Sequence, residues 1–583
     1  MSFFYRKSQL TVVLASIFLS DFALAGNTTD PLPLGTPSAG SILRQIEQLQ
    51  PQQVLPTTPE VKPVPKEIQK STAKVMVKGF RFKGNHLFTQ DELAGVVKQY
   101  IGKELTIEDL QNVAAEVSTF YRNKGYLAVA RLPKQDVTDG VITIEVDEAK
   151  YGGILLPERI ENNLHRVNPD VLESFMGNGQ QVTQPLSLQK LDRAILITND
   201  LPGVEAQGNL VPGDVEGETK VAVDARDKPL LSGDVTIDNW GSRVTGQNRA
   251  LADLLIASPT GIGDLVSLSG LYTDGSQYGR LEYALPLGYD GWRLGVNTSH
   301  LNYQLITSDF VATQPKGLSS TYGLDTQYPL VRTQSYNLTL TSTFDYKYFN
   351  NQYLSSTGGF IPSSDYTIQV YTIGLTEVKT DDWLGGGTTV TSLNYGIGSV
   401  DLANSPNFVS DSLNAQTNGG YQRLRLALNR TQTLTQDYSM YFSFQGQLAN
   451  KNLDPSEKLY LGGPTGVRAY PLSEGGGDVG YIENLELRKQ VNNRLQLAGF
   501  LDNGMISQNK NNYSASGQAL NLVNTYHLSG YGLMATYIGP YKSLLKLIWS
   551  HRIGGNPNPT TTGLDQAGSL IYNQFWMSAM LPF

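Results

Sequence analysis

The 583-residue chain contains no cysteine. This absence excludes a disulfide framework, thiolate metal sites and cysteine nucleophiles. Basic residues are also in the minority, because 45 lysines and arginines stand against 53 aspartates and glutamates, a formal net charge of −8. Binding of nucleic acid needs a basic surface. We therefore expect no nucleic-acid partner.

Long apolar runs are missing too. Beyond the N-terminal segment, no run reaches the roughly 18 apolar residues of a membrane-spanning helix. The N-terminal segment has Arg6 and Lys7, an apolar stretch over 10–19 and the sequence Ala23-Leu24-Ala25. This order is typical of a secretory signal peptide, and the stretch is too short for a membrane anchor. We interpret residues 1–25 as a signal peptide of an exported chain.

Motifs of catalysis are also lacking. The five histidines are scattered without metal-binding spacing, and neither a nucleophile elbow nor a phosphate-binding loop occurs. We expect no catalytic residues, no metal and no cofactor, and hence no enzyme. An outer-membrane phospholipase or protease stays open as the enzymatic alternative.

Tyrosine and glycine are abundant instead, with 31 and 58 residues, and only 17% of residues are charged. From 228 to 583, segments of about ten residues alternate apolar and polar side chains between turn-forming clusters, as in membrane β-barrels. In one segment, Phe344 and Tyr346 alternate with Asp345 and Lys347. At about 22 residues per strand and connection, this region predicts a transmembrane β-barrel of roughly 16 strands. A tyrosine-rich soluble β protein would fit the composition alone.

The final segment also alternates. Five apolar side chains share one face of the predicted last strand: Phe575, Met577, Ala579, Leu581 and Phe583. A last strand that ends in an aromatic residue resembles the signal read by the outer-membrane barrel-assembly machinery. We expect Phe583 to serve as that signal.

Two segments before the barrel, 73–150 and 151–227, repeat the order β-α-α-β-β. In the first, a strand is predicted over Val75–Phe82, and Thr89 and Thr106 open capping boxes that begin two helices. Two tandem copies of one small α+β unit indicate a short repeat array.

The segment 26–50 contains a short amphipathic helix, for which we predict Ser41 as the N-cap. Its apolar positions follow helical spacing: Ile42, Leu43, Ile46 and Leu49. A helix this short is marginal in water and needs a surface to pack on. Five prolines then indicate an extended linker over 51–72, long enough to carry the helix through a membrane-sized object.

Together these features resemble the two-partner secretion transporters, the TpsB branch of the Omp85 superfamily. Val467-Arg468-Ala469-Tyr470 resembles the motif at the tip of the sixth loop of these barrels, and Phe500-Leu501-Asp502-Asn503-Gly504 resembles a motif on a nearby strand. The resemblance implies that loop six folds into the lumen and that Arg468 bonds Asp502. Ala469 stands where the family usually has glycine, which puts the local backbone conformation in question.

The fold that the resemblance implies is mainly β: a 16-stranded transmembrane barrel, two periplasmic POTRA domains and an N-terminal plug helix. A helix lying free in the periplasm is the alternative to a plug. The implied function is outer-membrane translocation of a large unfolded exoprotein captured by the POTRA domains. Outer-membrane lipid and the barrel-assembly machinery are the other expected partners. A barrel-assembly insertase and a passive porin are the alternatives, and the cargo is open among an adhesin, a haemolysin and a contact-dependent inhibition toxin.

Overall fold

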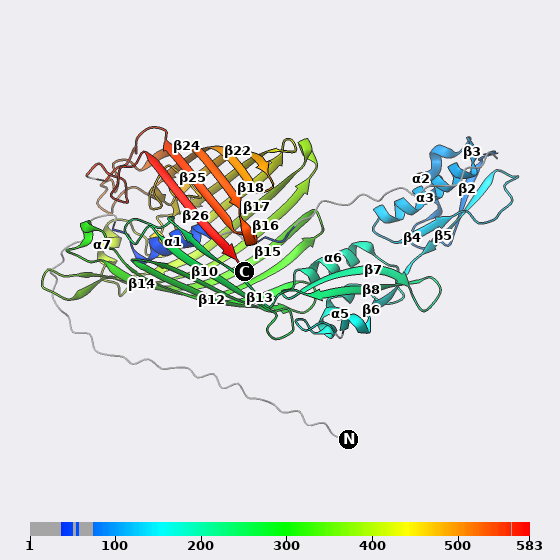
Figure 1. Cartoon of the computed structure of the whole chain (residues 1–583), viewed down its shortest axis with the longest axis horizontal. Helices are drawn as coiled ribbons and strands as arrows, with labels where there is room; N and C mark the ends of the chain where they lie inside the picture. The colour runs from blue at the N-terminus through cyan, green and yellow to red at the C-terminus, as the bar shows by residue number, and fades with distance from the viewer. Residues whose placement is uncertain (1–35, 51–53, 57–73, 162, 561) are drawn as a thin grey trace, which may run out of the picture.

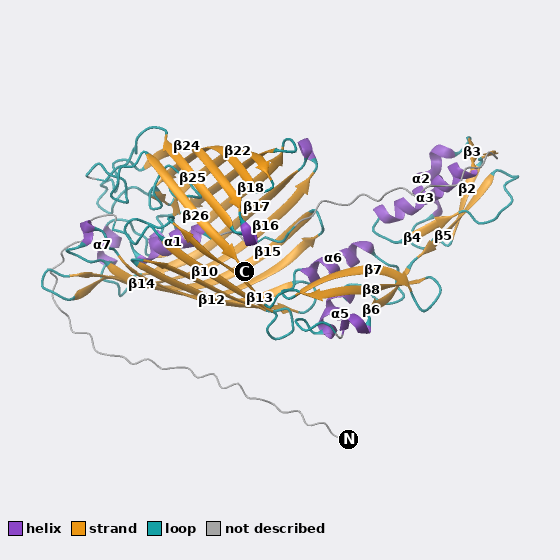
Figure 2. Cartoon of the chain, viewed as in Figure 1, coloured by secondary structure: helices purple, strands orange, loops and turns teal. Residues whose placement is uncertain are grey.

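The computed structural model describes residues 36–50, 54–56, 74–161, 163–560 and 562–583. The signal peptide expected at 1–25 lies outside these residues, and so does most of the linker expected at 51–72. The described chain forms a large barrel, one helix inside it and two α+β units beyond one of its ends (Figure 1). Figure 2 shows that the two units combine helices with short strands, whereas the barrel consists almost entirely of strands.

The first α+β unit consists of a three-stranded sheet, a two-stranded sheet and two main helices. Its elements are β1 (Lys74–Met76), β2 (Gly79–Lys83), α2 (Gln90–Val97), a 3-10 turn at Lys98–Tyr100, β3 (Glu104–Thr106), α3 (Ile107–Asn123), β4 (Ala128–Arg131) and β5 (Val141–Glu148). β5 is central, parallel to β2 and antiparallel to β4. Thr89 and Thr106 cap α2 and α3 through capping boxes, as the sequence predicts.

The single strand predicted at Val75–Phe82 is wrong. β1 pairs with β3, whereas β2 pairs with β5 in another sheet. Between them, the Val77 N–H donates to Lys103 O and the Lys78 N–H donates to Gly140 O. An extended segment that changes partners keeps its alternating pattern, so the local sequence gives no sign of the break.

The second unit repeats the topology of the first. Its elements are β6 (Lys150–Leu155), α4 (Glu158–Glu161), α5 (Pro169–Gly177), α6 (Leu188–Asn199), β7 (Val204–Pro212) and β8 (Glu218–Asp227). The sheet order β6-β8-β7, with a parallel and an antiparallel pair, matches the order β2-β5-β4. The predicted tandem repeat is therefore present in the structure.

Sixteen strands of the described chain close into one antiparallel barrel. They are β9 (Leu231–Asp238), β10 (Arg249–Ala257), β11 (Leu265–Thr273), β12 (Ser276–Leu287), β13 (Trp292–Gln304), β14 (Lys316–Arg332), β15 (Tyr336–Leu354), β16 (Phe360–Asp381), β17 (Gly387–Asp401), β18 (Gly419–Thr433), β19 (Tyr438–Ala449), β22 (Val479–Asn492), β23 (Leu495–Ser507), β24 (Thr525–Ile538), β25 (Leu544–Arg552) and β26 (Asn573–Pro582). β26 pairs with β9 and completes the ring. The predicted strand number is confirmed.

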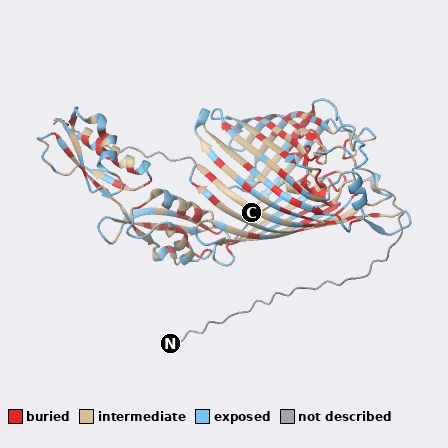
Figure 3. Cartoon of the chain, turned by 180° about the vertical axis from the view of Figure 1, so that it is seen from behind, coloured by how far each residue is buried: buried red, intermediate tan, exposed pale blue. Residues whose placement is uncertain are grey.

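Alternation along the strands separates an apolar outer face from a polar lumen. On β15, Phe344 and Tyr346 are exposed on the outside, whereas Lys347 is buried inside. Figure 3 shows the resulting interchange of buried and exposed residues along the barrel strands. Outward apolar side chains suit lipid, where a charge near the midplane costs about 2–4 kcal/mol.

The second α+β unit is attached to the short-turn end of the barrel. Asp200 accepts two hydrogen bonds from Arg332 at the end of β14, at 2.7 and 2.8 Å. Arg193 on α6 pairs with Asp290 in the turn between β12 and β13, at 3.3 Å. Arg332 also donates to the carbonyl oxygen of Pro56, at 3.2 Å. The segment that follows the N-terminal helix therefore reaches the same end of the barrel.

The N-terminal helix α1 (Ala39–Leu49) lies inside the lumen (Figure 1). The prediction of Ser41 as its N-cap is wrong, because Ser38 is the N-cap. The Ser38 side chain accepts from the Ser41 N–H, and the Ser41 side chain accepts from the Ser38 N–H. Ser41, at the third helical position, accepts the hydrogen bond that glutamate or glutamine usually accepts in a capping box. The sequence therefore lacks the usual capping-box pattern.

Candidate functional site

Two elements occupy the barrel lumen. One is α1, and the other is the connection between β19 and β22 over residues 450–478, the sixth of the connections at the end remote from the α+β units. We call it loop six. It contains a 3-10 turn (Pro455–Glu457), β20 (Leu459–Tyr460) and β21 (Gly476–Gly477). Four buried side chains from the predicted loop motif belong to it: Val467, Arg468, Ala469 and Tyr470.

The structure brings Arg468 and Asp502 together. Asp502 on β23 accepts from Arg468 Nε at 2.9 Å, from Nη2 at 2.7 Å and from the Arg468 backbone N–H at 3.0 Å. The Arg468 and Asp502 side chains are 5% and 0% exposed. A two-pronged guanidinium–carboxylate pair is strongly directional. Loop six is thereby fixed to one strand of the wall.

A second carboxylate completes this ion cluster. Glu486 on β22 accepts from Arg468 Nη1 at 2.7 Å. Asn484, two residues earlier on the same face of β22, donates to Asp502 at 2.8 Å and to the Gly466 carbonyl oxygen at 2.9 Å. Neither Glu486 nor Asn484 belongs to the two sequence motifs. Their alternation with outward leucines is the signal that would have placed both in the lumen.

The Phe500 ring forms the floor of the cluster, with the Arg468 guanidinium carbon 3.5 Å from its centroid. Gly504 lies two residues beyond Asp502 on the same face, and a Cβ there would come within 3.2 Å of Val467. The third motif residue is therefore glycine because loop six packs directly on the strand. Each residue of the predicted strand motif thus touches or makes room for loop six.

The backbone after Arg468 is also bound. Ser550 on β25 and Trp576 on β26 donate to the Arg468 carbonyl oxygen, at 2.7 and 2.8 Å. Arg552 donates to the Ala469 carbonyl oxygen at 3.2 Å and lies over the Tyr470 ring. Loop six therefore contacts β22, β23, β25 and β26 around one tip.

Ala469 departs from the family pattern without strain. Its φ is not positive, so a side chain at this position meets no backbone penalty. Opposite it lies Gly530 on β24, where a Cβ would approach the Ala469 Cβ to 2.6 Å. The methyl group thus occupies space that a glycine across the contact leaves free.

The start of loop six carries a second buried ion cluster. Glu457, fully buried, contacts Lys347 of β15 at 3.2 Å and Arg423 of β18 at 2.8 Å. Burial alone would raise the pKa of Glu457, but Arg423 and Lys347 lower it to about 2. Arg425 donates to the Glu457 carbonyl oxygen at 2.9 Å. Loop six is therefore fixed to opposite parts of the wall at its start and at its tip.

The helix α1 contacts loop six mainly through the loop backbone. Arg44 Nε donates to the Lys458 carbonyl oxygen at 3.1 Å, and Gln48 donates to the Tyr460 carbonyl oxygen at 2.8 Å. Gly40 packs on the 3-10 turn, where a Cβ would lie 3.2 Å from the Ser456 Cβ. The absence of a side chain at Gly40 permits this close approach.

The apolar face of α1 packs on the wall. Ile42 and Leu43 are buried in a cluster with side chains of the barrel, and Ile46 is half-buried against the same cluster. Leu49 lies further down and lines a cavity. All four predicted apolar side chains therefore lie inside the barrel, three of them against its wall.

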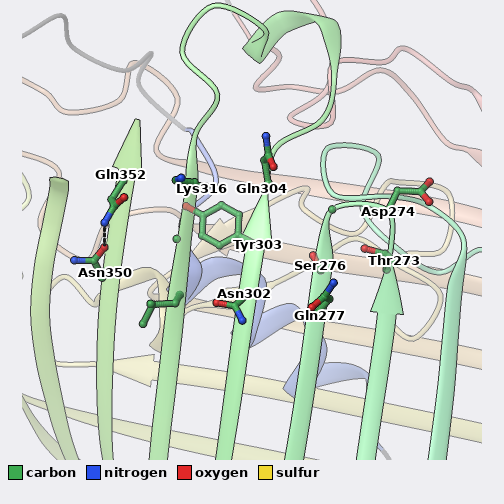
Figure 4. A pocket seen from close by; sticks show the side chains of 13 residues that line it. Thr273, Asp274, Ser276, Gln277, Asn302, Tyr303, Gln304, Lys316, Asn350 and Gln352 are labelled. Carbon is green, nitrogen blue, oxygen red and sulfur yellow. Dashed lines mark hydrogen bonds between the residues drawn. The ribbon is translucent and has the colours of Figure 1, made fainter. Parts of the chain in front are cut away.

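The N-terminus of α1 lies at the end of the barrel remote from the α+β units. The Ala39 N–H donates to Asn351 Oδ1 at 2.8 Å, and Tyr303 Oη donates to the same oxygen at 2.8 Å. Figure 4 shows Tyr303 at the strand ends with α1 behind the strands, beside a polar hollow of about 440 Å³. Pro56 lies at the opposite end, so the described residues 36–50 and 54–56 together contact both ends of the barrel.

Below α1 the lumen is not filled. Two cavities of about 450 and 520 Å³ share Arg280 and Glu282 in their lining, which also includes Asp325, Asp345 and Arg249. Charges of both signs line this space. Glu47 of α1 lines one cavity, and Ile46 and Leu49 line the other, so α1 borders this unfilled space.

Loop six also contacts the connection between β25 and β26, over residues 553–572. Glu474, fully buried, accepts from the Gln566 N–H at 2.8 Å and from Asn556 Nδ2 at 2.9 Å. Asp565 nearby is paired with Arg552. Burial raises the pKa of Glu474 to about 7, although both hydrogen bonds oppose the rise. This contact therefore holds a carboxyl group that ionises near neutral pH.

Phe583 lies at the closure of the barrel. Its N–H donates to Gly233 O at 2.9 Å, and its carbonyl oxygen accepts from the Gly233 N–H at 3.2 Å. The ring is exposed on the outer face. Within the described residues, no group of three or more potential ligands is placed to hold a metal ion.

Two family models and several known transporters match this chain. The model of the family described as haemolysin secretion/activation protein ShlB/FhaC/HecB matches residues 217–524, and that of the POTRA domain, ShlB-type, matches residues 75–149. The heme/hemopexin transporter protein HuxB of Haemophilus influenzae (strain 86-028NP) is 27% identical over 596 residues, 98% of this chain and 99% of that protein. The hemolysin transporter protein ShlB of Serratia marcescens is 25% identical over 468 residues, 76% of each chain.

Among solved structures, CdiB from Escherichia coli superimposes with a TM-score of 0.69 at 18% identity, covering 93% of this chain and 98% of that one. CdiB from Acinetobacter baumannii gives a TM-score of 0.62 at 16% identity, over 93% and 96%. These structures share the overall fold of this chain.

Replacing Asp502 by asparagine should loosen loop six. Removal of one partner of a buried ion pair costs about 3–5 kcal/mol, so we expect the ratio of closed to open barrels to fall by roughly a hundredfold to several thousandfold. Channel recordings in planar bilayers measure this ratio, and the heat-dependent gel shift checks that the barrel is intact. The control is Asp381→Asn, which breaks a partly exposed pair with Arg430 worth about 1 kcal/mol or less. Equal recordings for both variants would contradict this assignment.

Opening should also depend on pH through Glu474. Its pKa in the folded protein is raised, so the contact between loop six and residues 553–572 is most stable below about pH 4.5 and weakens as pH rises to about 7. We expect the open probability in planar bilayers to increase between pH 5 and pH 8. In Glu474→Gln this increase should disappear. A wild-type protein whose open probability is the same at both pH values would show that Glu474 does not control the contact.

Proposed function

Because this chain belongs to the haemolysin secretion/activation family ShlB/FhaC/HecB, an outer-membrane family with POTRA domains in the periplasm, we propose the following mechanism. The chain captures an unfolded partner protein in the periplasm and conducts it through the barrel to the cell surface. The helix α1 acts as a plug, and loop six acts as an inner gate. The observation that carries the proposal is the closed lumen, whose two contents belong to the chain itself and contact each other.

Capture of the partner is assigned to the POTRA domains. In the first, β2 and β4 are the edges of the sheet β2-β5-β4, and Val129 on β4 is 57% exposed. An extended peptide can add to such an edge through backbone hydrogen bonds, which tolerate varied sequence. This mode of binding suits a partner that arrives unfolded.

Conduction uses the charged space below the plug. Side chains of both signs in the two cavities keep the lumen hydrated without favouring one peptide charge. There is no ATP outside the inner membrane, so folding of the partner at the surface supplies the direction. This function is transport, and we assign the chain no catalytic step.

The two rival functions are a barrel-assembly insertase and a passive porin. A barrel-assembly insertase of the same superfamily resembles this chain in its barrel, but the helix that fills the lumen and its long linker favour export. A passive porin has no need for two modules that capture peptides. The exposed Phe583 supports recognition by the barrel-assembly machinery during biogenesis, and the apolar outer face supports contact with lipid.

The similarity to known transporters also bears on the cargo. The heme/hemopexin transporter aligns over 98% of this chain, whereas the CdiB of Dickeya dadantii aligns over 70% and the hemolysin transporter ShlB over 76%. We therefore favour an exoprotein of the kind handled by the heme/hemopexin transporter over a contact-dependent inhibition toxin or a haemolysin.

The first test removes the capture domain. Deletion of residues 75–149 should abolish secretion of the co-expressed partner, because the unfolded partner no longer binds in the periplasm. Immunoblotting of the culture medium measures secretion. Barrel levels in the outer membrane should stay normal, since the second POTRA domain supplies the contacts to the barrel. Loss of other outer-membrane barrels in a depletion strain would favour the insertase. Undiminished secretion would exclude capture by this domain.

The second test joins the plug to loop six. The chain has no cysteine, and a Cβ at position 40 would lie 3.2 Å from that of Ser456, near the spacing of about 3.5–4.5 Å in disulfides. The double variant Gly40→Cys/Ser456→Cys should stop secretion when oxidised and recover it with a reductant. Each single variant is the control. Full secretion by the oxidised double variant would mean that the plug and loop six need not separate.

A further inference from the structure

The outer face of the barrel has a large apolar groove on β22 to β26. It measures about 770 Å³, and its lining is almost entirely apolar. These strands form the nearest wall in Figure 1. The groove is on the membrane side of the wall whose inner side binds loop six, and Trp576 belongs to both, since it lines the groove and donates to the Arg468 carbonyl oxygen.

Strand register explains why the groove exists. One outward row runs Lys489, Leu497, Ala535, Leu547 and Met577 across five strands. The next row toward the cell surface runs Leu487, Gly499, Leu533, Trp549 and Phe575. Gly499 and Ala535 are the smallest members and lie diagonally adjacent, so the surface is hollow between large apolar neighbours.

Gly499 is not required by the backbone or by packing. Its φ is not positive, and a Cβ there would meet only the Leu533 side chain at 3.9 Å. Several glycines of the same strands are needed for close packing, as Gly504 is for loop six. At Gly499 the missing side chain leaves open space on the lipid side instead.

Cations without acidic partners stand at the periplasmic end of the groove. Lys489 lies over the Tyr438 ring, 5.5 Å from its centroid, and both residues line the groove. Arg494 and Lys542 lie in the adjacent turns, and both are exposed. None of these three cations forms an ion pair among the described residues. A basic and aromatic rim below an apolar groove matches a lipid with an anionic headgroup.

We propose that this groove is a binding site for an anionic phospholipid of the periplasmic leaflet. One acyl chain lies along Gly499 and Ala535, and the phosphate is held at Lys489 and Arg494. The groove begins two residues above the start of β23, which places it in the periplasmic half of the membrane. Ordinary contact with lipid needs neither a hollow nor cations. The assignment of a phospholipid site rests on the presence of both in one place.

The test measures lipid binding to the purified full-length protein by native mass spectrometry. Dioleoyl phosphatidylglycerol and dioleoyl phosphatidylethanolamine share their acyl chains and differ in headgroup charge. Wild type should bind phosphatidylglycerol more tightly. Each of Lys489→Gln and Arg494→Gln should weaken that binding by about fivefold and leave phosphatidylethanolamine unchanged.

Gly499→Leu fills the groove and should weaken binding of both lipids by about tenfold, the loss of roughly two buried methylene groups. The matched control is Gly279→Leu on β12, an exposed position where a Cβ also meets open space.

Equal binding by wild type, Gly499→Leu and Gly279→Leu would overturn the site. Equal binding of both lipids by wild type would overturn the anionic assignment. A change in oligomeric state of Gly499→Leu without a change in lipid binding would show that a second copy, not lipid, occupies the groove.

Discussion

The closed state of this barrel depends on a buried charge, the Arg468 guanidinium at the tip of loop six. Its two carboxylate partners, Asp502 and Glu486, come from neighbouring strands of the wall. A guanidinium removed from water is stable only while those partners and their hydrogen bonds are present. Loop six therefore stays in the lumen because withdrawal would separate Arg468 from Asp502, whereas Glu486 would keep its second partner, Arg488, at 2.7 Å. The tip also contacts all five strands from β22 to β26.

The plug depends on loop six but is held less strongly. Its polar contacts are mostly hydrogen bonds to loop carbonyl oxygens, and its charged contact to the wall, from Glu47 to Lys347, is long at 3.7 Å. Its large apolar side chains, Ile42 and Leu43, are buried against apolar side chains of the wall. Hydrophobic contact is not directional, so the helix can leave without breaking a buried ion pair of the wall. Displacement of the plug before loop six is the order that the energies favour.

The same strands present two different surfaces because their side chains alternate with period two. On β23, Phe500 and Asp502 face inward to bind loop six, whereas Leu497 and Gly499 face outward to lipid. Small residues on each face have separate reasons. Gly504 admits loop six on the inside, and Gly499 leaves a hollow on the outside. One strand can thus serve gating and lipid contact without conflict between the two.

The sequence by itself determined the features that depend on local periodicity or on a short motif. Alternation was enough for the barrel and its strand number, and capping boxes were enough for α2 and α3. The motif resemblance pointed to Arg468 and Asp502, and these side chains meet. The N-cap of α1 and the break after Val77 were misjudged, because a serine replaced the usual capping residue and because two sheets share one extended segment.

Only the tertiary structure decided the partners that lie far apart along the chain. Glu457 meets Lys347 across 110 residues, and Glu474 meets residues 553–572, through contacts that no local pattern encodes. Gly499 looks like any strand glycine until the register of five strands is known. The physical reason is the same in each case. Periodicity assigns a side chain to the lumen or to the lipid, but the closure of the barrel and the path of loop six decide which side chains meet there.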